Sequence, residues 1–207
     1  RGRSWHSRPG EGIYLSLILR PVLPLNEISR VTLAAAVAVV EVLKREARLA
    51  SGIKWPNDIL VNGKKITGIL TEAVTDIDGV EYIIVGIGIN VNNSAADFPQ
   101  EFRDTATSVR EEVKQKVSRI KLLQGLLEYW ESNYQQILNG EFNIILEKVR
   151  SLSLAIGRDV LIDSVNGAIA GRAIDIDNHG FLMVRDARGN IHHVMSGEIL
   201  IKETSQN

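Results

Sequence analysis

Apolar residues recur with two different periods in the first 91 positions, one typical of strands and one typical of a helix. Residues 13–19 are almost entirely apolar and predict a buried strand. The next apolar positions lie three or four residues apart, which predicts a helix that runs to about Ala50 and ends before Gly52. Asn26 or Ser29 is the expected N-cap of this helix, because both side chains accept hydrogen bonds from free backbone N–H groups.

A hairpin is predicted after this helix. Residues 59–61 are apolar and are followed by Asn62 and Gly63, the pair that best suits a two-residue hairpin turn. The returning strand is expected over residues 65–74, and a further strongly apolar strand over residues 81–91. These elements predict a meander of strands around one helix.

The second half of the chain changes from a helical to a strand-like pattern. A helix is predicted from about Ser118, because apolar residues then recur at spacings of three and four, and a shorter helix is predicted over residues 142–149. From Gly157 onward, short apolar segments alternate with glycine-containing turns, as in a small SH3-like β-barrel. The sequence therefore predicts an α+β domain over residues 1–152, with a mixed sheet packed against helices, and a small all-β domain over residues 153–207.

The composition is that of a globular protein and excludes several classes of function. The 24 Lys and Arg residues balance 25 Asp and Glu residues, so no overall positive field exists that would hold DNA or an anionic membrane. The absence of cysteine excludes disulfides, thiolate metal sites and cysteine nucleophiles, and it favours a cytoplasmic location. The longest apolar run, residues 33–40, is too short to span a bilayer, for which about 20 residues are needed. The chain opens at Arg1 within a basic segment, so we expect an upstream part in the full protein.

Three segments carry candidate chemistry, and the first is the basic loop Arg1-Gly2-Arg3-Ser4-Trp5. Its guanidinium groups suit a phosphate, and the face of its indole ring suits a purine. A solvated loop with a chance cluster of charge is an equal alternative for this segment taken alone.

The second segment is Lys54-Trp55-Pro56-Asn57-Asp58. Lys54 lies between apolar residues, so its ammonium group would be partly desolvated and would donate strongly to a carbonyl or phosphate oxygen. A rigid proline turn would place Asn57 and Asp58 at the same rim. The alternative is a polar turn between two strands without a function, and it is favoured when this segment is considered in isolation.

The third segment has glycine at alternate positions of a buried strand. Gly86 and Gly88 weaken the strand, and glycines in such places usually mark the close approach of a ligand or a neighbouring backbone. Gly68 repeats the feature on an adjacent strand, so the two strands together would form a slot for a flat ligand. The segment is not a dinucleotide-binding fingerprint, because no third glycine and no helix follow it. Packing at a β-bulge is the rival explanation.

The order of these segments resembles the biotin protein ligase family, whose members activate biotin with ATP and transfer it to a lysine of a carboxylase carrier domain. The resemblance rests on the pairing of Lys54-Trp55-Pro56-Asn57-Asp58 with Gly86-Ile87-Gly88-Ile89-Asn90, and the tail resembles the family's SH3-like C-terminal domain. It implies a catalytic fold like that of class II aminoacyl-tRNA synthetases. It also implies ATP and Mg²⁺ as cofactors, biotin as substrate, and a biotin carboxyl carrier protein domain as partner.

The resemblance also implies roles for individual residues. Lys54 would be catalytic, since it matches a lysine that contacts biotin and the mixed anhydride, and Arg3 would be catalytic near the phosphates. The residues that would contact biotin are Arg1, Gly2, Lys54, Gly68, Gly86 and Gly88. The residues that would contact ATP and the adenylate are Arg3, Trp5, Asn57 and Asn90. No metal ligands are assigned.

Several alternatives stay open at this point. A lipoate–protein ligase shares the reaction logic, although the compact pair of glycine strands favours the bicyclic ureido ring of biotin. A ligase that doubles as a transcriptional repressor would need a helix-turn-helix upstream of Arg1, and family members also bind the ureido ring with upstream segments. A protein-interaction module is supported only by analogy of fold. A homodimer could form through a strand edge such as residues 65–72.

Overall fold

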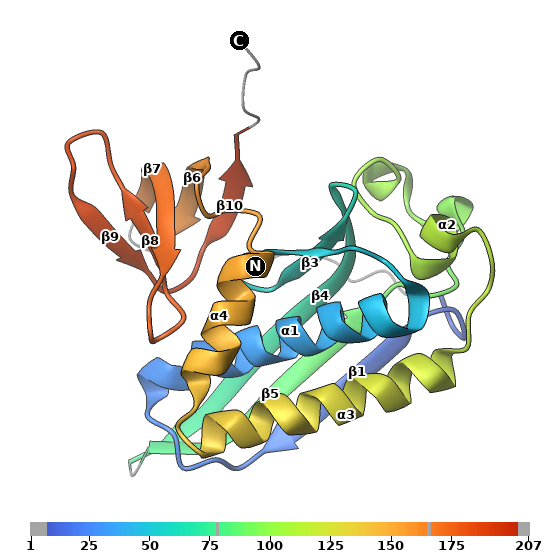
Figure 1. Cartoon of the computed structure of the whole chain (residues 1–207), viewed down its shortest axis with the longest axis horizontal. Helices are drawn as coiled ribbons and strands as arrows, with labels where there is room; N and C mark the ends of the chain where they lie inside the picture. Colours follow the sequence, from blue (N-terminus) through green and yellow to red (C-terminus); the bar gives the residue numbers. More distant parts are fainter. Residues whose placement is uncertain (1–7, 78, 165–166, 203–207) are drawn as a thin grey trace.

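The computed structural model describes residues 8–77, 79–164 and 167–202, which form two five-stranded sheets and a layer of helices (Figure 1). The first sheet has the spatial order β1-β5-β4-β3-β2, and its ladders are all antiparallel. Its strands are β1 (Ile13–Leu19), β2 (Gly52–Lys54), β3 (Asp58–Val61), β4 (Lys64–Asp76) and β5 (Gly79–Ile89). The predicted α+β class is confirmed. Within the described ranges, the mixed character of the pairing is limited to two isolated parallel bridges, Ile53 to Ser153 and Lys65 to Ala106.

Helices cover one face of this sheet (Figure 1). Helix α1 (Ile28–Ala47) packs against β4 and against α3 (Arg119–Leu138), and α4 (Phe142–Leu152) packs against α1. The β5 residues that face the helices are buried, and they are Ile83, Val85, Ile87 and Ile89. Short helices in the connections are η1 (Leu25–Glu27), η2 (Ala95–Asp97), η3 (Gln100–Phe102) and α2 (Val109–Val113). Because consecutive strand residues point to opposite faces, the glycines of β5 lie on the side away from the helices.

The start of α1 differs from the prediction. The N-cap position is Glu27, and no side chain caps the helix there, so the expected capping by Asn26 or Ser29 is wrong. The Ser29 hydroxyl donates instead to the carbonyl of His179, far along the chain. The Ser29 side chain therefore bonds to a distant segment of the chain and does not cap the helix, although serine favours the capping position.

The end of α1 also differs from the prediction. Arg48 adopts the left-handed conformation, with φ of 54°, and the helix stops at Ala47. Gly52 does not end the helix but begins β2, where an added side chain would collide with Leu154. Close packing against the segment after α4 is therefore the reason for this glycine.

The second sheet has the order β10-β6-β7-β8-β9 and is also antiparallel. Its strands are β6 (Asp159–Ser164), β7 (Gly167–Ile176), β8 (Leu182–Arg185), β9 (Ile191–Val194) and β10 (Glu198–Ile201). The predicted turns at Gly180 and Gly189 are present, with φ of 83° and 88°. The all-β tail is confirmed, and the division of the chain at residue 152 stays a prediction.

Strand β4 lies inside the first sheet rather than at its edge. Residues 64–68 pair with β3, and residues 67–76 pair with β5. A dimer contact through residues 65–72, which the sequence left open, is not available where β3 pairs with β4, and β1 and β2 are the outer strands.

No described helix combines the length and the apolar character that a bilayer-spanning segment needs.

Candidate functional site

One residue from each strand of the first sheet forms a continuous row across it. The register pairs Lys54 with Asp58, Asp58 with Gly68, Gly68 with Gly88, and Gly88 with Tyr14. Residues directly opposite each other in an antiparallel ladder point to the same side, so all five lie on the face away from the helices. We call these five residues the cross-strand row. The structure thus brings together two of the predicted biotin-contacting glycines and the predicted lysine on one surface.

Gly86 lies on the same face, two residues before Gly88 on β5, and the protein itself does not require a glycine there. Its φ lies outside the left-handed region. A Cβ added at this position would meet only the carbonyl oxygen of Leu70 at 3.6 Å and the Leu70 Cβ at 3.9 Å, which is ordinary contact. Among the described residues, the missing side chain therefore leaves space above Gly86, as expected of a slot for a ligand.

A β-bulge does not explain these glycines. The ladder between β4 and β5 shifts register only between Val74 and Thr75, and the ladder between β1 and β5 runs without a shift. Gly86 and Gly88 both lie in regular parts of these ladders. The rival explanation by bulge packing is wrong at these positions.

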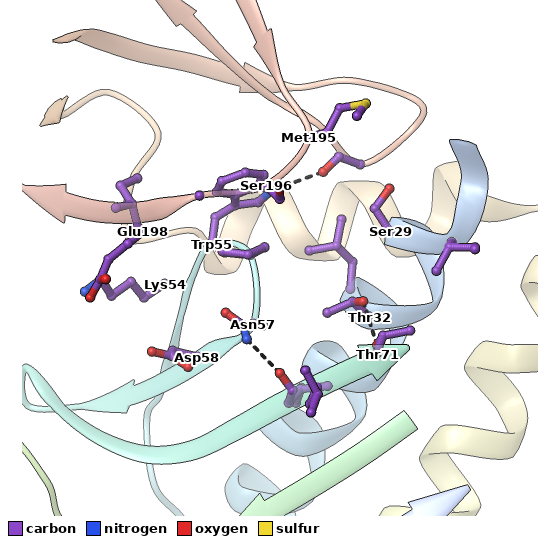
Figure 2. Close-up of a pocket in the computed structure, with 18 of the residues that line it drawn as sticks. Ser29, Thr32, Lys54, Trp55, Asn57, Asp58, Thr71, Met195, Ser196 and Glu198 are labelled. Atoms are coloured by element: carbon purple, nitrogen blue, oxygen red, sulfur yellow. Dashed lines mark hydrogen bonds between the residues drawn. The ribbon is translucent and has the colours of Figure 1, made fainter. Parts of the chain in front are cut away.

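Lys54 ends β2, just before the turn that contains a cis peptide bond between Trp55 and Pro56. Its neighbours Ile53 and Trp55 are 0% and 1% exposed, whereas Lys54 itself is half-buried. Lys54 and Asp58 line a cavity of about 790 Å³ between the first sheet, the start of α1 and the second sheet (Figure 2). This placement agrees with the partial desolvation expected for the lysine.

Residues of both parts of the chain surround this cavity. Figure 2 shows Ser29 and Thr32 of α1 on one side, Glu198 of β10 on the opposite side near Lys54, and Met195 of the connection between β9 and β10 above Ser29. The glycines of the cross-strand row are not among its lining residues. The cavity and the cross-strand row are therefore neighbours that share Asp58 and Lys54, and Gly68 and Gly88 of the row are buried.

The row separates Lys54 from the β5 glycines by a considerable distance. Gly88 lies three strands away from Lys54. Neighbouring strands lie about 4.8 Å apart, so the two Cα atoms are roughly 14 Å apart. An extended lysine side chain reaches roughly 6 Å. A molecule that touches both Lys54 and Gly88 must therefore extend along the row, above Asp58 and Gly68.

Lys65 provides a second ammonium group near the row, and it was not among the candidates selected from the sequence. Its Nζ lies 2.6 Å from Oδ1 of Asp58, the row member opposite Gly68. The two side chains are 43% and 22% exposed, so a ligand above the row could share this ion pair. A signal was present in the sequence, because a tight hairpin fixes the register that sets Lys65 opposite Leu60, on the same side as Asp58.

The two asparagines predicted for the nucleotide site both have structural hydrogen bonds. The amide nitrogen of Asn57 donates to the carbonyl of Ile69 at 2.7 Å, and the N–H of Ile69 donates to the backbone carbonyl of Asn57 at 2.9 Å. The amide nitrogen of Asn90 donates to the carbonyl of Thr107 at 3.0 Å. These bonds fix the orientation of each amide group. Asn57 lines the cavity beside Lys54, and Asn90 follows directly after β5.

Four of the candidate residues, Arg1, Gly2, Arg3 and Trp5, lie outside the described residues. Within the described part of the chain, no group of three or more His, Asp or Glu side chains is placed to hold a metal ion. At the far end of the row, burial raises the pKa of Tyr14 above its usual value.

Two family models match the chain. The model of the biotin/lipoate A/B protein ligase family matches residues 1–90, and the model of the biotin protein ligase C terminal domain matches residues 155–202. The fold is similar to that of the biotin protein ligase from Aquifex aeolicus in complex with biotin and ATP. The TM-score is 0.84 at 28% identity, over 98% of this chain and 83% of that one. The chain belongs to the biotin protein ligase family.

Two relatives show how much of a biotin protein ligase this chain represents. The bifunctional ligase/repressor BirA of Bacillus subtilis is 42% identical over 197 residues, which are 95% of this chain and 60% of that protein. The biotin–acetyl-CoA-carboxylase ligase of Mycobacterium tuberculosis is 29% identical over 204 residues, which are 96% of this chain and 73% of that protein. The chain thus spans about 60% of the length of the Bacillus relative.

Proposed function

We propose that this chain is the ligase part of a protein that activates biotin with ATP and transfers it to a lysine of a biotin carboxyl carrier protein domain. In the first step, a carboxylate oxygen of biotin attacks the α-phosphorus of ATP, forming biotinyl-5′-AMP and releasing pyrophosphate. In the second step, the neutral amine of the acceptor lysine attacks the biotinyl carbonyl. An amide forms, AMP leaves, and the amine loses a proton. Neither step needs a nucleophile from the protein.

The observation that carries this proposal is the space above Gly86, on the face of the first sheet that also carries the buried Gly68 and Gly88. Gly86 is a glycine without a conformational or packing reason, and it lies beside the cross-strand row. The bicyclic ring of biotin against this face would place its carboxylate chain along the row toward Asp58 and Lys54. The Aquifex relative, whose structure contains biotin and ATP, supports the same assignment of ligands.

The site would act mainly by positioning the reactants and by offsetting charge. Biotin and ATP are both anions, and Lys54 and Arg3 would stabilise the negative charge that develops as they are brought together. Lys65, held by Asp58 at 2.6 Å, would add a further cation on the same face. Each such contact contributes about 2–4 kcal/mol to the transition state when water is excluded.

The nucleotide would lie beside the cavity at the Lys54 end of the row. Arg3 would contact its phosphates and Trp5 its adenine, and Asn57 and Asn90 would contact the adenylate. The described residues contain no cluster of three metal-binding side chains, so the phosphates of ATP would supply the main ligands of Mg²⁺. The ion would neutralise phosphate charge when bound.

The proposal extends to the organisation of the chain. Residues 1–152 would form the catalytic domain and residues 153–207 the SH3-like C-terminal domain. A cytoplasmic location is part of the proposal and is supported by the absence of cysteine. Homodimer formation also stays a prediction, which sedimentation of the protein with and without biotin would test.

Two alternative functions have specific support. The first family model covers lipoate ligases as well as biotin ligases, but the second is specific to biotin protein ligases and favours biotin. The Bacillus relative is described as a ligase and repressor, so transcriptional repression is a second candidate activity of the whole protein. Binding to the promoter of a biotin operon in a gel-shift assay would test that activity.

The direct test incubates the full-length protein with biotin, Mg²⁺-ATP and a biotin carboxyl carrier protein domain. We expect pyrophosphate release that depends on biotin, and a carrier domain whose intact mass increases by one biotinyl group. Omitting the carrier should leave adenylate formation intact. Release that depends on lipoate rather than biotin, or no release with either acid, would overturn the proposed function.

A further inference from the structure

A turn of the second sheet is docked onto the first part of the chain by three hydrogen bonds. Residues 177–181 connect β7 to β8, and we call them the docking turn. Three consecutive backbone carbonyls of this turn accept hydrogen bonds from side chains of the N-terminal α+β part of the chain. Two of these side chains lie on α1 and the third directly follows β2. The donor and acceptor pairs are Arg30 Nε to Asn178 at 2.8 Å, the Ser29 hydroxyl to His179, and Trp55 Nε1 to Gly180 at 3.1 Å.

Hydrogen bonds within the second sheet fix the conformation of the docking turn. Oδ1 of Asp177 accepts from the backbone N–H groups of His179 and Phe181, at 2.9 and 3.0 Å. Oδ2 of Asp177 lies 2.7 Å from Nδ1 of His193 on β9. Because these bonds fix the path of the turn, its outward carbonyls present a preformed set of acceptors.

Gly180 fits this contact because it has no side chain. Its φ is 83°, and an added Cβ would lie 2.9 Å from Cδ1 of Leu33 and 3.2 Å from Oγ of Ser29. An added side chain would therefore have to displace the Leu33 side chain or move the turn away from α1. The indole that Gly180 holds belongs to Trp55, which is 1% exposed and follows Lys54 directly in the chain.

We propose that Gly180 and Trp55 are positioning residues of the ligase site. The docking turn fixes the indole, and the indole fixes the turn between β2 and β3 that carries Lys54 at one end and Asp58 at the other (Figure 2). The second sheet thereby sets the position of two members of the cross-strand row. This inference rests on the proposed function. A displacement of a reacting group by about 1 Å can cost up to about a hundredfold in rate.

The second sheet contains a matched control for this contact. Residues 186–190 repeat the docking turn in detail, since Oδ1 of Asp186 accepts from the N–H groups of Arg188 and Asn190, both at 2.9 Å. Gly189 has a φ of 88°, but an added Cβ would meet nothing within 4 Å. Gly189→Ala therefore carries the same backbone strain as Gly180→Ala without disturbing a docked contact.

The activity test compares these variants in the full-length protein. At saturating biotin and ATP, Gly180→Ala should lower kcat for pyrophosphate release by about tenfold or more, with a much smaller change in KM. Gly189→Ala should stay within about twofold of wild type. Trp55→Phe, which keeps an aromatic ring but removes the N–H donor, should reproduce the loss. The double variant Gly180→Ala/Trp55→Phe should be little worse than either single one, because both break the same contact.

A spectroscopic readout separates this inference from the proposed function. The indole N–H resonance of Trp55 should shift and exchange faster with solvent in Gly180→Ala, and should stay in place in Gly189→Ala. An unchanged indole resonance, or a shifted resonance with kcat equal to that of Gly189→Ala, would overturn the positioning role. A wild-type protein without biotin-dependent activity would overturn the proposed function, and the positioning role in catalysis with it, while the indole shift would still report the docked contact.

Discussion

Replacing Gly86 with alanine tests the open space above β5 directly. The added methyl group would meet only Leu70, at 3.6 Å from its carbonyl oxygen and 3.9 Å from its Cβ, so the fold should accept it. Glycine within a strand is less stable than alanine by roughly 0.5–1 kcal/mol, so the free energy of unfolding should stay unchanged or rise by about that amount.

The affinity for biotin should fall in Gly86→Ala, although the stability of the fold should not. The methyl carbon would occupy the layer in which a flat ring system lies against the strand, and overpacking a filled contact costs about 1–3 kcal/mol. Since about 1.4 kcal/mol corresponds to a tenfold change in affinity, the Kd for biotin should rise roughly 5- to 150-fold.

Titration calorimetry of the full-length protein with biotin measures this change, and thermal unfolding of the same samples shows that the fold is intact. Glu81→Ala, at an exposed position of the same strand, is the control and should leave both quantities unchanged. A Gly86→Ala protein that unfolds like wild type and binds biotin with wild-type affinity would refute the reasoning.

Three other perturbations have defined outcomes. Lys54→Ala should lower biotin-dependent pyrophosphate release at least about a hundredfold, and near-normal release would point to Lys65 as the cation that acts in this step. Hydrogen bonds from His192 and Asn190 hold the pKa of Asp186 well below its usual range, so the unfolded chain binds a proton that the folded chain does not. This contribution to stability is present above about pH 4 and is lost as the pH falls below it, so Asp186→Asn should lose less thermal stability than wild type between about pH 7 and pH 3. An equal acid loss in both proteins would contradict that assignment. Arg150→Met removes two hydrogen bonds to Asp175, at 2.8 and 3.0 Å, and should lower the free energy of unfolding by about 1–2 kcal/mol in urea titrations; an unchanged midpoint would contradict the role of this pair.

The elements that the sequence predicts well depend on neighbouring residues. Asn62 and Gly63 have φ of 51° and 77°, a region that asparagine and glycine adopt more readily than other residues, and the hairpin between β3 and β4 forms at this turn. The helix predicted from Ser118 begins there, because the Ser118 hydroxyl accepts a hydrogen bond from the N–H of Lys121. Such local chemistry can be recognised without knowing what packs against it.

The features that the sequence does not place depend on contacts between distant segments. Ser29 is a good N-cap residue by type, but its hydroxyl donates to His179, 150 positions away. Gly52 resembles a helix terminator, but it is a strand residue packed against Leu154. Periodicity shows which face of an element is buried, and it does not show which other segment covers that face.

Some features of the candidate site can likewise be predicted from the sequence, whereas others depend on how the strands pair. The alternation of Gly86 and Gly88 is visible in the sequence and predicts a ligand face, which the geometry of β5 supports. The hairpin turn sets Lys65 opposite Leu60 and so on the Asp58 side of the sheet, whereas the pairing of Asp58 with Gly68 depends on the irregularity between Ile59 and Leu60, which no residue pattern specifies. The ion pair between Lys65 and Asp58 is seen only in the structure.

A small acid that lies across the glycine face of the first sheet would change the backbone amide resonances of that face, which can be measured in the full-length protein. Saturating biotin should shift the N–H signals of Gly68, Gly86 and Gly88, and should leave that of Gly189, on the second sheet, in place. Saturable biotin binding that leaves the three glycine signals unmoved would contradict the account.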